Sequence, residues 1–234
     1  MKKYILLFIL FASIISGTKA QFTIAYSPGY GSYKMDDLKS LLNNMTSNAS
    51  GQLNGVPVKV VDNFPGYIAH SVDLSYRISR HEFGLRGTYL TTGGKVAYSD
   101  YSGEYYGKLT LNGYRFGLNY RFYIPAADFG NSGSLSFFLE ASPGITFSNL
   151  KSKEYLRILD QEQNVDENLD MDATGVSLLP QIGLKWDITS NIGVHVSGGY
   201  DFQLGSKFKS EGEKTMLKSD WSGIRINGGV SYTF

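Results

Sequence analysis

The sequence predicts an all-β fold in which eight antiparallel strands close into an up-and-down barrel. Apolar and polar residues alternate with period two, as on strands with two unlike faces, and the alternation continues to the last residue, Phe234. Glycine and aromatic residues are abundant and proline is rare (Gly 27, Tyr 17, Phe 14, Pro 6), which favours strands joined by tight corners. The connections between these segments are alternately long and short, without exception.

The first twenty residues have the composition of a secretory signal peptide. Their start is basic, residues 4–15 are almost entirely apolar, and small residues precede a cleavage site after Ala20. The apolar run is too short to cross a bilayer, which takes roughly twenty residues. We therefore divide the chain into a signal peptide, 1–20, and one barrel domain, 21–234.

The composition excludes several classes of site. The chain has no cysteine, which excludes disulfides, thiolate metal ligands and a lipidated cysteine at the cleavage point. Its net charge of +1 lacks the excess of basic residues typical of nucleic-acid binding. We expect no nucleic-acid partner and no cofactor.

Eight segments carry the alternation and are the expected strands. They are Phe22–Tyr33, Gly66–Ser79, Glu82–Thr92, Glu104–Ile124, Ser134–Phe147, Gly175–Ile188, Asn191–Leu204 and a terminal strand that starts near Leu217. In the fourth segment, Leu109 and Leu111 have the opposite phase from the apolar residues that follow. We therefore expect a β-bulge near Asn112-Gly113.

The connections after the second, fourth and sixth strands are short, and the other four are long. The long ones are 34–65, 93–103, 148–174 and 205–216. In barrels of the bacterial outer membrane, short turns lie in the periplasm and long loops outside. Both ends of the barrel domain are therefore expected on the periplasmic side.

The first long connection is expected to contain a short amphipathic helix. Leu38, Leu41, Leu42 and Met45 have helical spacing, and acidic residues precede them and favour a helix N-terminus there. We favour packing of this helix on its own loop. An envelope protein that binds through loop 34–65 is the alternative.

Charge decides which face of each strand meets which solvent. The positions that define the apolar register carry no ionisable side chain, whereas ten ionisable residues share the opposite register. These are Asp73, Arg77, Arg86, Arg115, Arg121, Glu140, Lys185, His195, Asp201 and Arg225. An Arg or Lys that faces the middle of a bilayer costs about 2–4 kcal/mol, so these groups must point inward. The barrel is thus expected to be transmembrane, because a soluble ligand-binding barrel would have its faces reversed.

The ten inward residues are expected to fill the lumen. An eight-stranded barrel is only wide enough for its own side chains, so the network is expected to form a charge-paired plug. It comprises six bases, three acids and His195, and Glu82 and Asp187 are further carboxylates that offset the basic excess. Aromatic residues at strand ends are expected in interfacial girdles. They are Tyr89, Tyr120, Trp186, Trp221 and Tyr232.

The end of the chain, "NGGVSYTF", carries a resemblance to known proteins. Val230, Tyr232 and Phe234 resemble the C-terminal signal by which outer-membrane proteins reach their assembly machinery. With the eight-strand layout, residues 21–234 resemble the small barrels typified by OmpX and the transmembrane part of OmpA, and are similar to the Bacteroidetes-type outer membrane protein beta-barrel domain family. The resemblance implies contact with outer-membrane lipid and lipopolysaccharide, and with the assembly machinery during biogenesis.

The mature chain has three histidines, and one of them lies in a pattern that suggests chemistry. His195 and Ser197 lie two apart on one strand and resemble the His-x-Ser pair of lipid A deacylases of the PagL type, in which the histidine deprotonates the serine. Their register points both into the lumen, away from the lipid that supplies an acyl chain, so no catalytic site is expected. His70 and His81 have no partner at ligand spacing and are expected to be solvated.

The third long loop, 150–172, is acidic. Its carboxylates are Asp160, Glu162, Asp166, Glu167, Asp170 and Asp172. Such groups can hold a divalent cation or meet cation-bridged lipopolysaccharide, but the glycine and the spacing of a calcium-binding loop are absent. We favour a solvated acidic surface and expect no metal site.

The sequence thus predicts an integral outer-membrane barrel with a plugged lumen. Its expected role is structural or interactive, through external loops or as an accessory to an envelope complex. A narrow porin-like channel is the main alternative, and a lipid A-modifying enzyme is the least favoured.

Overall fold

The computed structural model describes the chain in eight stretches. They are residues 21–52, 57–101, 103–130, 133–158, 161–165, 170–204, 207–210 and 213–234. The expected signal peptide lies outside them. None of the described helices is long and apolar enough to span a bilayer.

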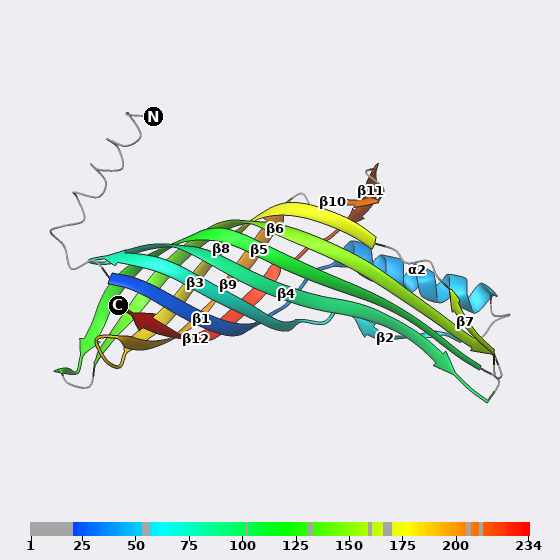
Figure 1. The fold of residues 1–234 in the computed structure, drawn as a ribbon, viewed down its shortest axis with the longest axis horizontal. Coiled ribbons are helices and arrows are strands. Elements are labelled where there is room, and N and C mark those ends of the chain that lie inside the picture. Colours follow the sequence, from blue (N-terminus) through cyan, green and yellow to red (C-terminus); the bar gives the residue numbers. More distant parts are fainter. Residues whose placement is uncertain are drawn as a thin grey trace.

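Eight antiparallel strands form a closed ring, which confirms the predicted fold class (Figure 1). In ring order they are β1 (Gln21–Gly31), β3 (Tyr67–Ile78), β4 (His81–Ser99), β5 (Gly103–Asp128), β6 (Ser134–Ile158), β8 (Asp170–Asp187), β9 (Ile192–Leu204) and β12 (Gly223–Thr233). The last strand pairs with the first from Thr23↔Thr233 to Gly31↔Arg225, which closes the ring. The barrel wall therefore has no free edge, as backbone groups in an apolar solvent require.

Side chains alternate between the inner and outer faces of the eight-stranded ring. Outward positions are apolar and exposed, for example Leu118 at 58% and Val196 at 50%. Inward positions of the same part of the barrel are polar and buried, for example Asp73 at 0% and Arg121 at 4%. The faces therefore have the assignment that the charge pattern predicted.

The two ends of the barrel differ. One end has short connections, and we call it the turn end. The other end has more strand structure than the sequence predicted, and we call it the extended end. Strands β4 and β6 continue well past their predicted ends, Thr92 and Phe147. With β5, which begins within one residue of its predicted start, they form a tall wall on one side (Figure 1). Four short strands are added to the extended end. They are β2 (Lys59–Asn63), β7 (Gln161–Val165), β10 (Lys207–Ser210) and β11 (Glu213–Lys218). The prediction that the terminal strand starts near Leu217 was wrong, because that residue belongs to β11.

The predicted bulge near Asn112-Gly113 was also wrong. Pairing of β5 with both neighbours runs without interruption through these residues, and its register shift lies instead between Pro125 and Ala127. Leu109 and Leu111 point inward like Arg115, but they are buried in an apolar cluster. The phase changes because the interior becomes apolar at the extended end, where a helix covers it.

Helix α2 (Asp36–Gln52) is longer than the predicted segment and packs on the inner face of the wall, against β2, β4 and β11. Leu38 and Leu42 are fully buried, in a cluster that includes Val96, Leu109 and Leu150 from the wall. We call this buried cluster, to which Leu38, Leu42, Val96, Leu109 and Leu150 belong, the apolar cap. Asp37, at the start of the helix, accepts a hydrogen bond from the backbone N–H of Lys218 at 3.1 Å.

Leu42→Ala is expected to loosen the apolar cap without opening the barrel. Truncating a fully buried leucine costs about 2–5 kcal/mol, and the loss falls on contacts between α2 and the wall. Hydrogen exchange in micelles should become faster in α2 and stay unchanged in β1 and β12. Ser40→Ala, at an exposed position of the same helix, is the control, and unchanged exchange in the Leu42 variant would contradict the assignment.

Candidate functional site

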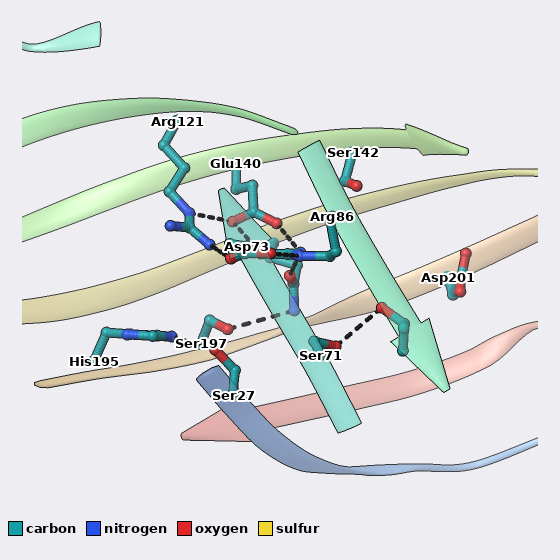
Figure 2. A network of polar contacts seen from close by, with 12 residues as sticks. Ser27, Ser71, Asp73, Arg86, Arg121, Glu140, Ser142, His195, Ser197 and Asp201 are labelled. Atoms are coloured by element: carbon teal, nitrogen blue, oxygen red, sulfur yellow. Dashed lines mark hydrogen bonds and ion pairs between the residues drawn. The ribbon is translucent and has the colours of Figure 1, made fainter. Parts of the chain in front are cut away.

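The interior of the barrel is organised around two arginines that share two carboxylates (Figure 2). Arg86 donates to both oxygens of Asp73, at 2.6 and 2.8 Å, and to both oxygens of Glu140. Arg121 donates to the same two carboxylates, at 2.5 Å each. All four side chains are at most 6% exposed. Charge-assisted and bidentate bonds of this kind are the strong ones.

The register of the sheet brings these partners together. Asp73 is directly opposite Arg86 across β3 and β4, and Arg121 is directly opposite Glu140 across β5 and β6. Glu140 is in turn opposite Gln181 of β8, whose Oε1 accepts from Arg86 at 3.1 Å. Five consecutive strands of the ring are therefore joined by one network.

Glu82 completes the middle of the network. It lies opposite Arg121 across β4 and β5, accepts from that guanidinium at 2.8 Å and accepts from the Tyr123 hydroxyl at 2.9 Å. From the sequence, Glu82 was expected only to offset the excess of basic residues in the lumen. It is 1% exposed, so it is as much a member of the network as the other residues.

A second layer lies toward the extended end. Arg115 donates to Ser177 at 2.8 Å and to Ser142, and its Nε is 3.9 Å from an Asp201 oxygen, so it spans the lumen from β5 to β8 and β9. Arg225 of β12 is 3.3 Å from the same Asp201 oxygen. It also donates to the carbonyl oxygens of Ser32 and Trp221, at 2.9 and 2.7 Å. This layer links the charged interior to the apolar cap.

A third layer lies at the turn end. Lys185 is 3.0 Å from Asp187, and Arg77 is 3.7 Å from the same carboxylate. The Arg77 guanidinium also lies 4.1 Å from the centre of the Tyr123 ring. Arg77, Lys185 and Asp187 line a cavity of about 520 Å³ at this mouth, together with Gln21 and Thr233.

Among the described residues, the three layers hold six basic and five acidic side chains. The bases are Arg77, Arg86, Arg115, Arg121, Lys185 and Arg225, and the acids are Asp73, Glu82, Glu140, Asp187 and Asp201. The basic excess expected from the ten predicted positions is therefore nearly offset by the two further carboxylates.

His195 is the tenth predicted lumenal residue, and its partner is not Ser197. Its Nε2 is 2.8 Å from the hydroxyl of Ser27 on β1, whereas the Ser197 hydroxyl accepts a hydrogen bond from Gln181 at 3.4 Å (Figure 2). His195, Ser27 and Ser197 are at most 9% exposed and all face inward. The histidine thus makes a polar contact between β9 and β1, which lie on either side of β12 in the ring.

Several contributors went unnoticed in the sequence because they are neutral. They are Ser27, Tyr123, Ser142, Ser177 and Gln181, and each bonds to a predicted member or to Glu82. All five share the inward register of the strand they occupy. Reading that register for every polar residue, instead of for charge alone, would have found them.

The other two histidines are exposed, and each also forms a hydrogen bond with a tyrosine hydroxyl. His70 is 2.8 Å from the hydroxyl of Tyr26, and His81 is 2.8 Å from the hydroxyl of Tyr120. Both pairs face outward. They are part of aromatic bands on the outer surface.

Trp221 was wrongly assigned to a girdle. It is 1% exposed, its ring packs edge-on against Tyr33 at 4.8 Å, and its indole N–H donates to Ser148 at 2.9 Å. Burial raises the pKa of Tyr33 to about 12. Trp221 therefore forms the floor of the apolar cap. Trp186 at 43%, Tyr120 at 36% and Tyr232 at 48% face outward, and Tyr89 does so in part.

The acidic loop is only partly described. Asp160, Asp166, Glu167 and the side chain of Glu162 lie outside the described residues. Asp170 and Asp172 both accept from the Asn149 amide, at 2.6 and 3.0 Å. In the described stretches of the chain, no group of three ligand residues is placed to hold a metal ion.

At the end of the chain, the three residues of the proposed assembly signal face outward. Val230, Tyr232 and Phe234 are all about half exposed or more. The Phe234 ring lies 4.9 Å from that of Tyr232 and 5.9 Å from that of Phe22, and its N–H donates to the Phe22 carbonyl. Phe22, Tyr232 and Phe234 form an aromatic band at the turn end, where β12 meets β1.

Fold and site together define a small barrel of the transmembrane class, apolar outside and ionised inside. No family model and no curated protein sequence matches the chain. Solved structures of similar fold include neisserial surface protein A (11% identity, 92% of this chain and 99% of that one, TM-score 0.46). Others are OprG from Pseudomonas aeruginosa (9%, 93% and 97%, 0.44) and Ail of Yersinia pestis in complex with sucrose octasulfate (12%, 92% and 97%, 0.39). At these identities the likeness concerns the fold alone.

Arg121→Met is expected to destabilise the barrel strongly. It leaves Asp73, Glu82 and Glu140 with fewer cations in a buried site, and breaking one buried ion pair costs about 3–5 kcal/mol. Urea unfolding in micelles should show the loss as a lower midpoint.

The matched control is Arg157→Met. Arg157 pairs with Glu104 at 3.2 Å, but both side chains are more than 40% exposed, so this change should cost at most about 1 kcal/mol. Equal midpoints for the two variants would show that Arg121 is solvated in the barrel.

Proposed function

We propose that the chain is an integral outer-membrane protein whose lumen is closed and which acts through its extended end. Its role is that of a structural or interaction protein, either alone or as an accessory to an envelope complex. The observation that carries this proposal is the division between the two faces of one closed sheet. Ionised groups bond to each other across the interior, while a belt of exposed apolar side chains surrounds the outside of the ring.

The apolar outer surface supports a lipid environment. Its exposed residues include Phe116 at 60%, Leu85 at 59% and Ile182 at 67%, all on different strands. Water-soluble monomers rarely expose a contiguous apolar surface of such extent. Aromatic side chains lie at both borders of this belt, as at membrane–water interfaces.

The connection lengths support an orientation. Short turns join β3 to β4 and β8 to β9, and the wall, α2 and the added strands lie at the other end. In outer-membrane barrels the short turns are periplasmic. We therefore infer that the extended end faces the outside and that both ends of the described chain lie toward the periplasm.

Cysteine labelling tests membrane insertion and orientation together, since the chain has no cysteine of its own. With a membrane-impermeant thiol reagent, Ser99→Cys at the extended end should react in intact cells. Ser190→Cys in a short turn should react only after the outer membrane is opened. Leu118→Cys, facing lipid, should react in neither case. Reversal of the first two results would overturn the orientation, and ready labelling of Leu118→Cys would overturn insertion.

A narrow channel is the second candidate, since the lumen is polar and opens into the 520 Å³ cavity at the turn end. Two features of the described residues argue for closure. Arg115 spans the lumen to β8 and β9, and the apolar cap with Trp221 lies beyond it. A path for ions would have to break both.

Planar-bilayer recording separates these candidates. The closed barrel should give no steady large conductance, while a porin of known conductance inserted in the same membrane serves as the positive control. Stable large steps from the purified protein would support the channel and refute the closed lumen.

We further propose that His195 has a structural role and that the protein carries out no covalent chemistry. Its contact with Ser27 and its burial support this. A change in lipid A acylation on substituting His195, Ser27 or Ser197 would contradict it. Membership of the Bacteroidetes-type barrel family, delivery through the terminal aromatic signal and an envelope partner at loop 34–65 stay predictions.

A further inference from the structure

Three lysines form a straight row on the outer face of the extended wall. Lys95 on β4 is directly opposite Lys108 on β5, and Lys108 is directly opposite Lys153 on β6. Residues directly opposite on one face of a sheet have Cβ atoms about 5 Å apart, and like charges at that spacing are destabilising. We call these residues the lysine row. Their juxtaposition has a cost in the protein alone, which an anionic ligand would remove.

The charges around the lysine row neutralise it only in part. Asp62 on β2 is directly opposite Lys95 in register. The residues directly opposite Lys108 are the other two lysines, Lys95 and Lys153. Two other basic residues of β6 have acidic partners, since Lys151 is 3.9 Å from Asp170 and Arg157 is 3.2 Å from Glu104.

Only the outer face of the wall is open at this height. The inner face is covered by α2, where Val96 is fully buried beside the lysine row. Lys108 and Lys153 are exposed, and Lys95 lies 4.7 Å from the centre of the Tyr106 ring. The ammonium groups therefore line one solvent-facing surface on three adjacent strands.

The height of the lysine row above the apolar belt distinguishes the ligands that can reach it. On these strands an outward aromatic pair, Tyr106 opposite Tyr155, lies beyond the lysine row, and the nearest outward aromatic pair on its membrane side is Tyr89 opposite Tyr114. Lys108 is six residues further along β5, or about 20 Å along the strand and about 15 Å along the axis of a barrel tilted by about 40°. The headgroup layer of a phospholipid leaflet is only about 5–8 Å thick. A phospholipid phosphate would therefore lie below the lysine row.

We propose that the lysine row binds the anionic sugar core of an outer-leaflet glycolipid, through phosphate or carboxylate groups that stand above the membrane surface. Lipid-anchored sugars surround the wall at the required height and carry the complementary charge. Binding would hold the wall upright in the glycolipid layer. This inference rests on the proposed outward orientation of the extended end.

The test compares two double variants of the full barrel in phosphatidylcholine nanodiscs. Lys108→Gln/Lys153→Gln removes two charges from the lysine row. Lys34→Gln/Lys39→Gln removes two charges from the start of α2, because Lys34 lies two residues before the helix and Lys39 lies at its start. The probe is purified lipopolysaccharide with lipid A and a phosphorylated inner core. We expect about thirtyfold weaker binding for the first variant, since each of the two lysines near an anionic surface contributes roughly 1 kcal/mol, and unchanged binding for the second.

A second probe, lipid A without core sugars, checks the height argument. The difference between the first variant and the wild type should disappear with this probe, because its phosphates lie at the membrane surface. Equal loss with both probes, equal loss in both variants, or no loss would overturn the proposal. If the first variant loses binding only to a soluble sulfated polysaccharide and keeps its binding to lipopolysaccharide, the lysine row has a different ligand, and the proposal is overturned. Because nanodisc binding does not depend on orientation in cells, it fails separately from the labelling experiment.

Discussion

Ionised side chains inside this barrel must find their partners within a ring of eight strands, because the lumen holds little besides the side chains themselves. Asp73, Arg86, Arg121 and Glu140 meet this constraint by lying opposite one another on neighbouring strands. Shifting one strand by a single residue would turn its charges toward the outside and its apolar side chains inward. The network therefore fixes the register of the strands as well as filling the lumen, and the apolar outer belt follows from the same register.

The interior changes its chemistry along the barrel axis. Charged layers occupy the part enclosed by all eight strands, and an apolar cap occupies the part beside the wall. Arg225 joins the two, since it pairs with Asp201 on one side and donates to the Trp221 carbonyl on the other. An ordinary hydrophobic core at the extended end lets α2 pack without needing lipid or a partner. The apolar cap therefore stabilises the extended end, which is larger than the eight-stranded ring alone would support.

The wall divides its two faces between different tasks. Its inner face packs on α2 and stabilises the extended end, while its outer face carries the lysine row. Alternation of side chains along a strand makes this division possible, since neighbouring residues such as Lys95 and Val96 point in opposite directions. The internal charges pair with each other across the barrel, and the lysine row is the outer cluster for which we propose an anionic ligand.

The period-two pattern determined the number of ring strands, their up-and-down order and which charged residues face inward, because the two faces of a barrel wall meet unlike solvents and every ring strand must match both. Arg86, Arg121 and Glu140 could be placed in the lumen on that basis. The pairing of His195 with Ser27, the part of Glu82 and the burial of Trp221 were decided only by the tertiary structure. They depend on register between strands far apart in the sequence and on a helix that turns the interior apolar at one end. Alternation along a single strand contains neither, which is why Leu109 and Leu111 resembled a bulge.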